Sequence, residues 1–331
     1  MKHGGDLKDA MARYGGDPAD WLDLSTGINP VAWPVAEQLP ADVWQRLPAL
    51  SQLNALLDQA RASYGVPGHL DVIAAPGTQA LIQWLPRIAP DGPVAIVTPT
   101  YSEHHDAWTT TGRKVYHAPT LGEATGLATN VVVTNPNNPD GRTTAPADII
   151  EAAHTLAERG GRLIVDEAFA DIDPSVSVVP HLGDLPMIVL RSFGKFFGLA
   201  GVRLGFAIAR PPAALQLAAA LGPWAVSGPA LEIGRRALSD SDWITATRKQ
   251  IAGDAARLDK IVAAAGLSVI GGTGLYRLIN MPEAASLHTK FAEHRIWTRI
   301  FDEYPDWLRL GLPGTNPDFA RLETALAAIG Q

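Results

Sequence analysis

Short apolar runs recur along the first two thirds of the chain, and stretches with a helical pattern separate them. A strand that is apolar at successive positions is buried on both faces, which is typical of a mainly parallel sheet between helices. Residues 146–160 fit a crossover helix, because Pro146 stands at its start and Gly160 at its end. The strands expected from these runs are 70–74, 94–97, 131–133, 163–165, 188–190 and 204–208. The pattern predicts an α/β domain of three layers, with helices on both faces of a mainly parallel sheet.

The pattern changes after Pro229. A long helical region rich in alanine and charged residues, 230–265, is followed by a strand at 275–279 and a closing helix with Asn316 as its N-cap. This change predicts a second, smaller α+β domain. The expected domains are a large one, 30–230, and a small one formed by 1–29 and 231–331.

The composition excludes several classes of function. Hydrophobic residues make up 47% of the 331 positions, which is enough for a substantial core. A net charge of -7 without any cluster of lysine and arginine argues against a nucleic-acid partner, whose phosphates require a basic face. The absence of cysteine excludes disulfides, thiolate nucleophiles and cysteine-bound zinc, and no metal site is expected.

Two features of the sequence bear on its location in the cell. The first residues lack the apolar stretch of a signal peptide. The longest apolar run, 213–226, is interrupted before it could span a membrane. We therefore expect a cytoplasmic protein without a membrane partner.

Four segments with chemically functional residues directly follow predicted strands. Ligands of open α/β sheets bind beyond the carboxyl ends of the strands, so these segments are candidates for one site. A glycine turn at 75–81 opens a helix whose free N–H groups would bind an anion, and Tyr101 follows the next strand. A stiff loop of sequence NPNNPDG lies at 135–141, and Asp166 ends the strand after it. Taken singly, each has an ordinary structural explanation as a turn, a core tyrosine or a helix cap.

The segment around Asp166 also matches most of the Walker B strand of P-loop NTPases. That class needs the motif G-x-x-x-x-G-K-[ST] upstream, whereas Gly194-Lys195 lies downstream and is followed by Phe196. We therefore reject a P-loop NTPase. Lys195 stands in an apolar, aromatic stretch, where an unpaired ammonium is costly to bury. Such a lysine either reaches water or takes part in chemistry.

The order of these motifs resembles that of the class I/II aminotransferase superfamily, whose members are fold type I enzymes dependent on pyridoxal 5'-phosphate (PLP). The motifs NPNNPDG, VDEAF and SFGKFFGLAGVRLG carry the resemblance, which covers nearly the whole chain. It implies PLP as the cofactor and a homodimer with its sites near the interface. Two positions depart from the family pattern, because Phe169 and Leu47 stand where relatives have tyrosines that contact the cofactor.

The resemblance assigns a role to each matching residue. Lys195 would bond covalently to the aldehyde carbon of PLP and later transfer protons at the substrate, which needs an amine of lowered pKa. Asp166 would pair with the pyridine nitrogen and keep it protonated. Asn138 would hydrogen-bond the phenolic oxygen, and Tyr101 would stack on the ring. The remaining expected cofactor contacts, mostly to the phosphate, are Gly77, Thr78, Gln79, Ser192 and Arg203.

Segments near the ends of the chain indicate which reaction the cofactor would support. The segments HGGD at 3–6 and LDLSTGINP at 22–30 resemble those of family members that decarboxylate a phosphorylated amino acid. The implied reaction converts L-threonine O-3-phosphate into (R)-1-amino-2-propanol O-2-phosphate and carbon dioxide, a step of cobalamin biosynthesis. The expected substrate contacts are His3, Gly4, Asn29, Asn138, Arg295 and Arg309.

The substrate of that reaction carries both a carboxylate and a phosphate, and arginine forms paired hydrogen bonds with either group. By resemblance, Arg309 would bind mainly the carboxylate, and His3, Gly4, Asn29 and Arg295 mainly the phosphate. Two alternatives stay open. The first is transamination, of histidinol phosphate or a related amine, by nearly the same residues. The second is a catalytically silent PLP-binding regulator, which is disfavoured because the chain has no basic helix-turn-helix segment.

Overall fold

The computed structural model describes residues 4–35 and 39–330, which form two compact units. The central unit comprises residues 33–138 and 142–244. The terminal unit comprises residues 139–141 and the two ends of the chain, up to residue 32 and from residue 245. The domain limits expected from the sequence stay a prediction. Over the described ranges, no helix is both long and apolar enough to cross a membrane.

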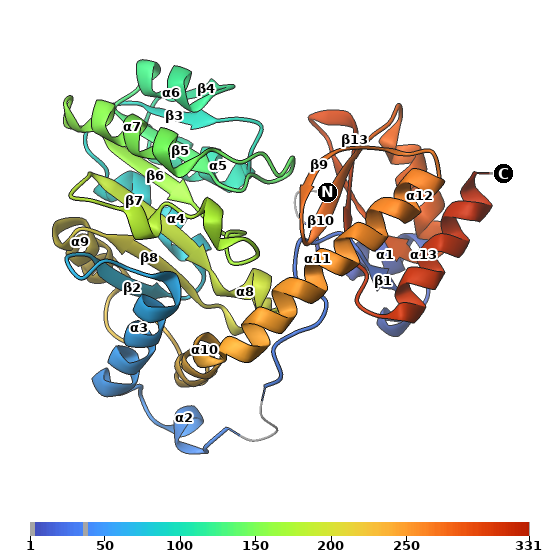
Figure 1. Ribbon diagram of the computed structural model, residues 1–331, viewed down its shortest axis with the longest axis horizontal. Helices are drawn as coiled ribbons and strands as arrows, with labels where there is room; N and C mark the ends of the chain where they lie inside the picture. Colours follow the sequence, from blue (N-terminus) through green and yellow to red (C-terminus); the bar gives the residue numbers. More distant parts are fainter. Residues whose placement is uncertain (1–3, 36–38, 331) are drawn as a thin grey trace. The chain divides into compact units, whose positions relative to one another are not determined.

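The core of the central unit is a sheet of seven strands, counted over the described residues, in the order β2-β8-β7-β6-β5-β3-β4 (Figure 1). Strands β3 to β7 run parallel to one another, whereas β8 runs antiparallel to both of its neighbours. The mainly parallel sheet predicted from the apolar runs is confirmed. The strands are β2 (Asp71–Ala75), β3 (Val94–Val97), β4 (Val115–Ala118), β5 (Asn130–Thr134), β6 (Arg162–Asp166), β7 (Met187–Ser192) and β8 (Gly205–Ala209).

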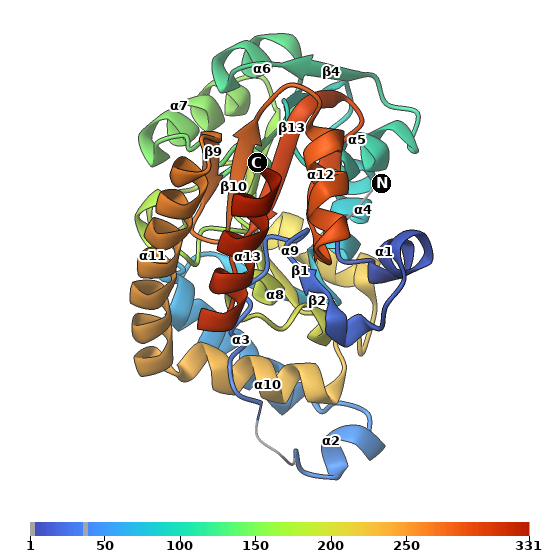
Figure 2. The ribbon, with the colours of Figure 1, turned by 90° about the vertical axis from the view of Figure 1, so that its right-hand side faces the viewer.

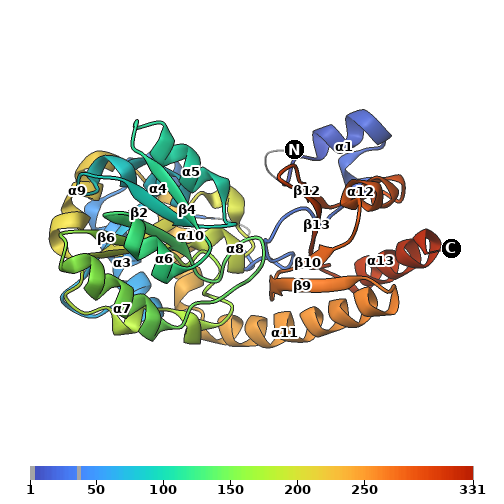
Figure 3. The same cartoon turned by 90° about the horizontal axis from the view of Figure 1, so that it is seen from above.

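Helices cover both faces of this sheet (Figure 3). Helices α4, α5 and α9 pack on one face, where Val132, Ile164 and Ile188 are buried. Helix α7 lies on the other face, toward which the alternate strand residues point. Both faces of the strands are therefore apolar, as the sequence pattern requires. The helices of this unit are α2 (Asp42–Gln45), α3 (Leu50–Tyr64), α4 (Thr78–Ile88), α5 (Ser102–Thr109), α6 (Leu121–Leu127), α7 (Pro146–Ala157), α8 (Phe193–Phe196), α9 (Pro211–Leu221) and α10 (Gly228–Ser239).

The terminal unit is built around an antiparallel sheet in the order β12-β13-β10-β9, with helices α12 and α13 beside it (Figure 2). A short parallel pair, β1 with β11, joins the N-terminal segment to this unit. The architecture is α+β, as expected. The elements are α1 (Leu7–Tyr14), β1 (Leu22–Asp23), β9 (Ser268–Thr273), β10 (Tyr276–Asn280), α12 (Ala284–Glu293), β11 (Ile296–Trp297), β12 (Arg299–Phe301), β13 (Tyr304–Gly311) and α13 (Asn316–Ile329), and α11 (Ser241–Ala264) runs from the central unit into this one.

Two expectations about helices are corrected by the structure. The helical region at 230–265 forms two helices, because the helix is interrupted at Asp240. The Asp240 carboxylate accepts hydrogen bonds from the Trp33 indole and from the backbone N–H of Trp243. The N-cap of α13 is Thr315 and not Asn316. The Thr315 hydroxyl accepts from the Asp318 backbone N–H, and the Asp318 carboxylate accepts from the Thr315 N–H, which forms a capping box.

Candidate active site

A pocket of about 720 Å³ lies at the carboxyl ends of the parallel strands in the central unit. All nine residues that the sequence assigned to cofactor contacts line it: Gly77, Thr78, Gln79, Tyr101, Asn138, Asp166, Ser192, Lys195 and Arg203. They come from separate stretches of the chain and meet because their strands end at one edge of the sheet. The structure thus brings these residues together, and their individual roles stay predictions.

One end of the pocket is suited to an anion. Helix α4 begins at Thr78 after Gly77, which has φ 83°, and no side chain caps its first N–H groups. A Cβ atom at Gly77 would lie 2.6 Å from Nη2 of Arg203, so any other residue would displace the guanidinium from its place beside the start of the helix. Arg203 itself adopts a left-handed φ of 55°, an unfavourable conformation for arginine. Free N–H groups, a helix dipole and a guanidinium together favour a bound phosphate.

The carboxylate of Asp166 at the end of β6 has a buried partner that the sequence analysis missed. Its Oδ2 atom lies 2.9 Å from Nε2 of His104, and its Oδ1 accepts a hydrogen bond from the Ala168 N–H at 3.1 Å. His104 is fully buried on α5. The signal available in the sequence was its spacing from Tyr101, because residues three apart near the start of a helix lie on the same side. His104 fixes the orientation of the carboxylate that faces the pocket.

Lys195 is carried by the short helix α8, which directly follows β7. Aromatic side chains hold this helix in place, since the rings of Phe193 and Phe197 stack at 4.6 Å and that of Phe197 stacks on Trp243 at 5.6 Å. The Lys195 ammonium lies 5.8 Å from the centre of the Phe169 ring. At this position the family usually has tyrosine, and phenylalanine offers the lysine an aromatic face without a hydroxyl. The backbone of the lysine is therefore fixed while its amine reaches the pocket.

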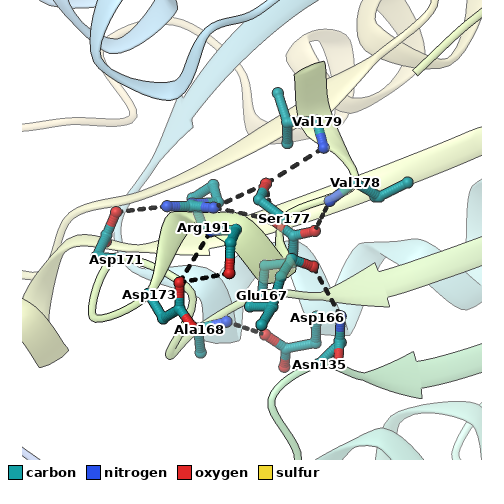
Figure 4. Close-up of polar contacts among 12 residues, drawn as sticks. Asn135, Asp166, Glu167, Ala168, Asp171, Asp173, Ser177, Val178, Val179 and Arg191 are labelled. Atoms are coloured by element: carbon teal, nitrogen blue, oxygen red, sulfur yellow. Dashed lines mark hydrogen bonds and ion pairs between the residues drawn. The ribbon is translucent and has the colours of Figure 1, made fainter. Parts of the chain in front are cut away.

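A buried ion network supports the strand ends behind the pocket (Figure 4). Arg191 on β7 forms an ion pair with Glu167 at 2.8 Å and a second one with Asp171. Glu167 also accepts hydrogen bonds from the Ser177 hydroxyl at 2.6 Å and the Val178 N–H at 2.7 Å. Burial raises the pKa of Glu167. Burial alone would lower the pKa of Arg191, but the attraction of the two carboxylates raises it.

Two members of this ion network are adjacent in the sequence to residues that line the pocket. Glu167 follows Asp166, and Arg191 precedes Ser192, so the ion pair links β6 and β7 one residue away from two pocket residues. Removing one partner of a buried ion pair leaves an uncompensated charge, which costs about 3–5 kcal/mol. The register of the two strand ends is therefore strongly constrained.

The NPNNPDG loop is held by asparagine side chains as well as by its prolines. The Asn135 amide donates to the Thr144 and Val176 carbonyls and accepts from the Thr144 N–H. The Asn137 amide donates to the Pro99 carbonyl at 2.7 Å and accepts from the Thr100 hydroxyl at 2.7 Å. Asn138, which lines the pocket, directly follows these two fixed residues. These hydrogen bonds add to the restraint that the sequence predicts from the prolines.

Most of the predicted substrate residues lie in the terminal unit, whereas Asn138 lies in the central unit and His3 lies outside the described residues. Gly4 and Arg309 meet at Ser25. The backbone carbonyl of Ser25 accepts from Nη2 of the buried Arg309 at 2.8 Å, and a Cβ atom at Gly4 would lie 2.3 Å from the same carbonyl oxygen. Asn29 is buried, and its side chain accepts from the Val31 N–H at 3.0 Å.

The structure gives Arg295 partners within the polypeptide. Its Nη1 donates to the Gly15 carbonyl at 2.6 Å, its guanidinium lies 5.9 Å from the centre of the Trp21 ring, and Asp20 is 3.9 Å away. These contacts tie the segment after α1 to the residue that precedes β11. The role predicted for Arg295 in substrate binding stays a prediction, but a structural role accounts for all of these contacts.

Arg299, which the sequence analysis passed over, lies directly opposite Arg309 in the antiparallel pair β12–β13. Opposed residues of such a pair project from the same face of the sheet, and like charges there are destabilising. Burial, together with the like charge of Arg299 and against the opposing effects of Tyr276 and Asp23, lowers the pKa of Arg309 to about 10. Burial also lowers the pKa of Arg299, and the negative charge of Asp302 opposes that shift. Both cations would therefore be stabilised by a bound anion. Arg299 lies within the hairpin that contains Arg309, whereas Arg295 precedes β11 and lies outside it.

Comparison with known proteins places the chain in a family. The family model described as aminotransferase class I and II matches residues 52–329. A threonine-phosphate decarboxylase from a Sinorhizobium species is 46% identical over 330 residues, which cover 99% of this chain and 98% of that protein. A threonine-phosphate decarboxylase from Pseudomonas aeruginosa is 40% identical over 332 residues, which cover 98% of this chain and 97% of that protein.

The fold is shared with a solved structure. Histidinol-phosphate aminotransferase from Sinorhizobium meliloti, solved in complex with pyridoxal-5'-phosphate, has a TM-score of 0.85 to this chain at 19% identity, over 98% of this chain and 95% of that one. In the described part of the chain, no three His, Cys, Asp or Glu side chains gather as metal ligands. The chain belongs to the aminotransferase class I and II family.

Proposed function

We propose that this chain is a PLP-dependent enzyme that decarboxylates L-threonine O-3-phosphate to (R)-1-amino-2-propanol O-2-phosphate, as part of cobalamin biosynthesis in the cytoplasm. The observation that carries the proposal is the full-length similarity to two threonine-phosphate decarboxylases. The pocket of the central unit would supply the cofactor contacts that such a reaction needs. Arg299 and Arg309 of the terminal unit, which we call the arginine pair, would supply contacts for the substrate.

The residues of the pocket fit PLP. The uncapped start of α4, together with Ser192 and Arg203, would hold the phosphate, and the missing side chain at Gly77 lets the Arg203 guanidinium lie close to that helix start. Asp166 would face the pyridine nitrogen, and Tyr101 would stack on the ring. When bound, PLP supplies an electron-withdrawing ring conjugated to the amino group of the substrate.

Asp166, Lys195 and Phe169 would then have separate roles in the reaction. Asp166, held by His104, keeps a proton on the pyridine nitrogen, because a carboxylate nearby favours the charged form of the ring. Lys195 would hold the cofactor before substrate arrives, and afterwards, as an ammonium group, it would donate a proton at Cα, the carbon from which carbon dioxide leaves. Phe169, which is buried beside the lysine, limits the access of water to that amine.

The arginine pair of the terminal unit would take the anionic groups of the substrate. Arg309 is the proposed contact for the carboxylate, and Arg299 is the proposed contact for the phosphate. Guanidinium groups suit both anions because they can donate two parallel hydrogen bonds to either. An anion would also relieve the repulsion between the two cations.

Purified holoenzyme incubated with threonine phosphate and no keto acid tests the proposal. We expect release of carbon dioxide together with formation of aminopropanol phosphate, followed by phosphorus and proton NMR. Transamination of histidinol phosphate is the second candidate, since the solved relative with the same fold is a histidinol-phosphate aminotransferase. Release that requires 2-oxoglutarate, or no release of carbon dioxide at all, would reject the decarboxylase.

The arginine pair leads to a first prediction. Arg299→Ala should raise KM for threonine phosphate about 10- to 100-fold, because a charge-assisted hydrogen bond is worth about 1.5–3 kcal/mol. Free threonine, which has no phosphate, should be affected much less. Arg295→Ala is the comparison variant, and the loss of its Gly15 contact should lower Tm, with a smaller rise in KM than Arg299→Ala gives. The opposite pattern in the two variants would restore Arg295 as the substrate residue.

We also propose that the enzyme is a homodimer and that an apolar groove of the central unit is part of the interface. The groove encloses about 940 Å³ and is lined by residues that include Leu50, Leu53 and Trp224. Leu50 is 71% exposed, Trp224 is 59% exposed, and Leu47 nearby in the sequence is 68% exposed. Exposed apolar side chains in such a cluster mark an interaction surface. Leu47 also occupies the position whose tyrosine reaches the neighbouring subunit in the family pattern, which favours a second copy as the partner.

The mass in solution tests the dimer. Wild-type protein should elute with twice the 35.2 kDa mass of the chain in light scattering coupled to size exclusion. Leu50→Asp should shift the protein toward the monomer, because it places an unpaired charge in an apolar interface. Leu127→Asp is the control, since Leu127 is 47% exposed on α6 and does not line the groove. A monomeric wild type would exclude this interface.

A further inference from the structure

A buried histidine–threonine pair in the terminal unit has no role in the chemistry described so far. Nδ1 of His288 on α12 lies 2.8 Å from the hydroxyl oxygen of Thr298, and both side chains are buried. Two buried polar groups are worth little to stability compared with an apolar pair of the same shape, because their hydrogen bond mainly compensates for lost hydration. Packing alone therefore does not account for this pair.

Thr298 is the corner at which the chain passes from one sheet to another. The strand before it, β11, pairs in parallel with β1. The strand after it, β12, pairs antiparallel with β13. Thr298 is the single residue between these two strands and is fully excluded from solvent. The hydrogen bond to His288 thus fixes a point where two sheets meet.

The two strands that flank Thr298, which form the arms of this corner, are both linked to the arginine pair, Arg299 and Arg309. On one arm, the Leu24 N–H donates to the Trp297 carbonyl at 2.8 Å, and the next residue, Ser25, accepts from Arg309. On the other arm, Arg299 follows Thr298 directly and lies opposite Arg309. A shift or rotation at Thr298 would therefore move Arg299 and the Ser25 segment relative to each other.

The surroundings of His288 explain why this position suits a neutral partner. Its ring packs on Trp297 with the ring centres 4.4 Å apart. Burial, together with the positive charges of Arg13 and Arg299 and against the opposing effect of Asp9, lowers the pKa of His288 to about 4. The imidazole is therefore neutral near pH 7. A carboxylate at this position would anchor the threonine as well, but it would also neutralise Arg299 and compete with an anionic ligand.

We propose that His288 and Thr298 are positioning residues for Arg299, and that they set the preference of the enzyme for a phosphorylated substrate. The inference rests on the proposed function, since it takes Arg299 as the phosphate contact. The hydrogen bond orients the first residue of β12 without adding a charge. Its loss should weaken the binding of the phosphate group more than it affects the chemistry at Cα.

Substitutions that preserve shape separate this role from stability alone. Thr298→Val removes the hydroxyl at nearly constant volume, Thr298→Ser keeps it, and His288→Phe keeps an aromatic ring beside Trp297. The double variant His288→Phe/Thr298→Val removes both polar groups and should recover most of the stability that each single change loses. Thr289→Val is the matched control, because Thr289 is exposed on the same helix and bonds the Ala285 carbonyl.

We expect Thr298→Val to raise KM for threonine phosphate about fivefold, with kcat and KM for free threonine nearly unchanged, since one hydrogen bond is worth about 1 kcal/mol. Thr298→Ser and Thr289→Val should behave as the wild type. The double variant should regain its Tm but keep the raised KM. Wild-type KM in Thr298→Val, or recovery of KM together with Tm in the double variant, would overturn the inference and leave only a structural pair.

Calorimetric binding of threonine phosphate to the holoenzymes separates this inference from the proposed function. A wild type that binds the compound without releasing carbon dioxide refutes the decarboxylase, and weaker binding by Thr298→Val still supports the positioning role. Equal binding by wild type and Thr298→Val refutes the positioning role alone. A wild type that does not bind the compound refutes both.

Discussion

Lys195→Ala holoenzyme is expected to lose turnover by a factor on the order of 10⁴ or more, together with the visible absorbance that PLP has when it is bonded to a lysine. Lys195 supplies the only primary amine among the residues that line the pocket. Without that amine, PLP would be held by its phosphate and ring contacts alone, and no base would stand beside Cα. Steady-state kinetics and an absorbance spectrum of the dialysed protein measure the two losses separately.

Two controls define what the loss means. Lys195→Arg keeps a positive charge near the Phe169 ring but offers no amine that can bond to the aldehyde, so it should be as inactive as the alanine variant. Lys249→Ala removes an exposed lysine on α11 and should leave both the spectrum and the rate unchanged. An unaltered spectrum in Lys195→Ala would mean that another lysine carries the cofactor. A wild-type spectrum that no amino acid changes would favour a silent PLP-binding regulator.

The cofactor pocket could be predicted from the sequence because of a property of parallel sheets. Apolar runs identify the buried strands, and the carboxyl ends of parallel strands lie at one edge, so the residues after Val97, Thr134 and Val165 must approach one another. No side-chain geometry is needed for that argument. The nine cofactor residues themselves were assigned by the resemblance, and this property of the sheet explains why they meet in one pocket although they are scattered over more than a hundred positions.

Features that depend on pairing between distant side chains could not be predicted in this way. A histidine in the first turn of a helix, such as His104, has the same sequence pattern whether it binds a carboxylate or fills a core. The ion pair of Arg191 with Glu167 joins two strands, and the local sequence around either residue does not indicate which residue it pairs with. Which residue lies opposite Arg309 depends on the register of the β12–β13 hairpin, and a shift of one residue would move Arg299 to the other face of the sheet.

Asp166→Asn should lower kcat about 10²- to 10³-fold while PLP affinity falls much less, because the change removes a charge but little volume. An amide can still accept from the Ala168 N–H and face His104, so the pocket keeps its shape. What it lacks is the negative charge that, in the proposed role of Asp166, holds a proton on the pyridine nitrogen. Without that proton, the ring withdraws electrons from the substrate less strongly, and the rate falls although the cofactor stays bound.

The neighbouring carboxylate provides the matched comparison. Glu167→Gln also removes one buried negative charge, but this charge faces Arg191 and Ser177 in the network behind the pocket. We expect this variant to lose stability in chemical denaturation and to retain a larger share of its kcat than Asp166→Asn. The two adjacent substitutions thus separate a charge that acts on the cofactor from a charge that fixes the strands. Equal losses of PLP affinity and kcat in Asp166→Asn would instead mean that the carboxylate serves only to bind the cofactor.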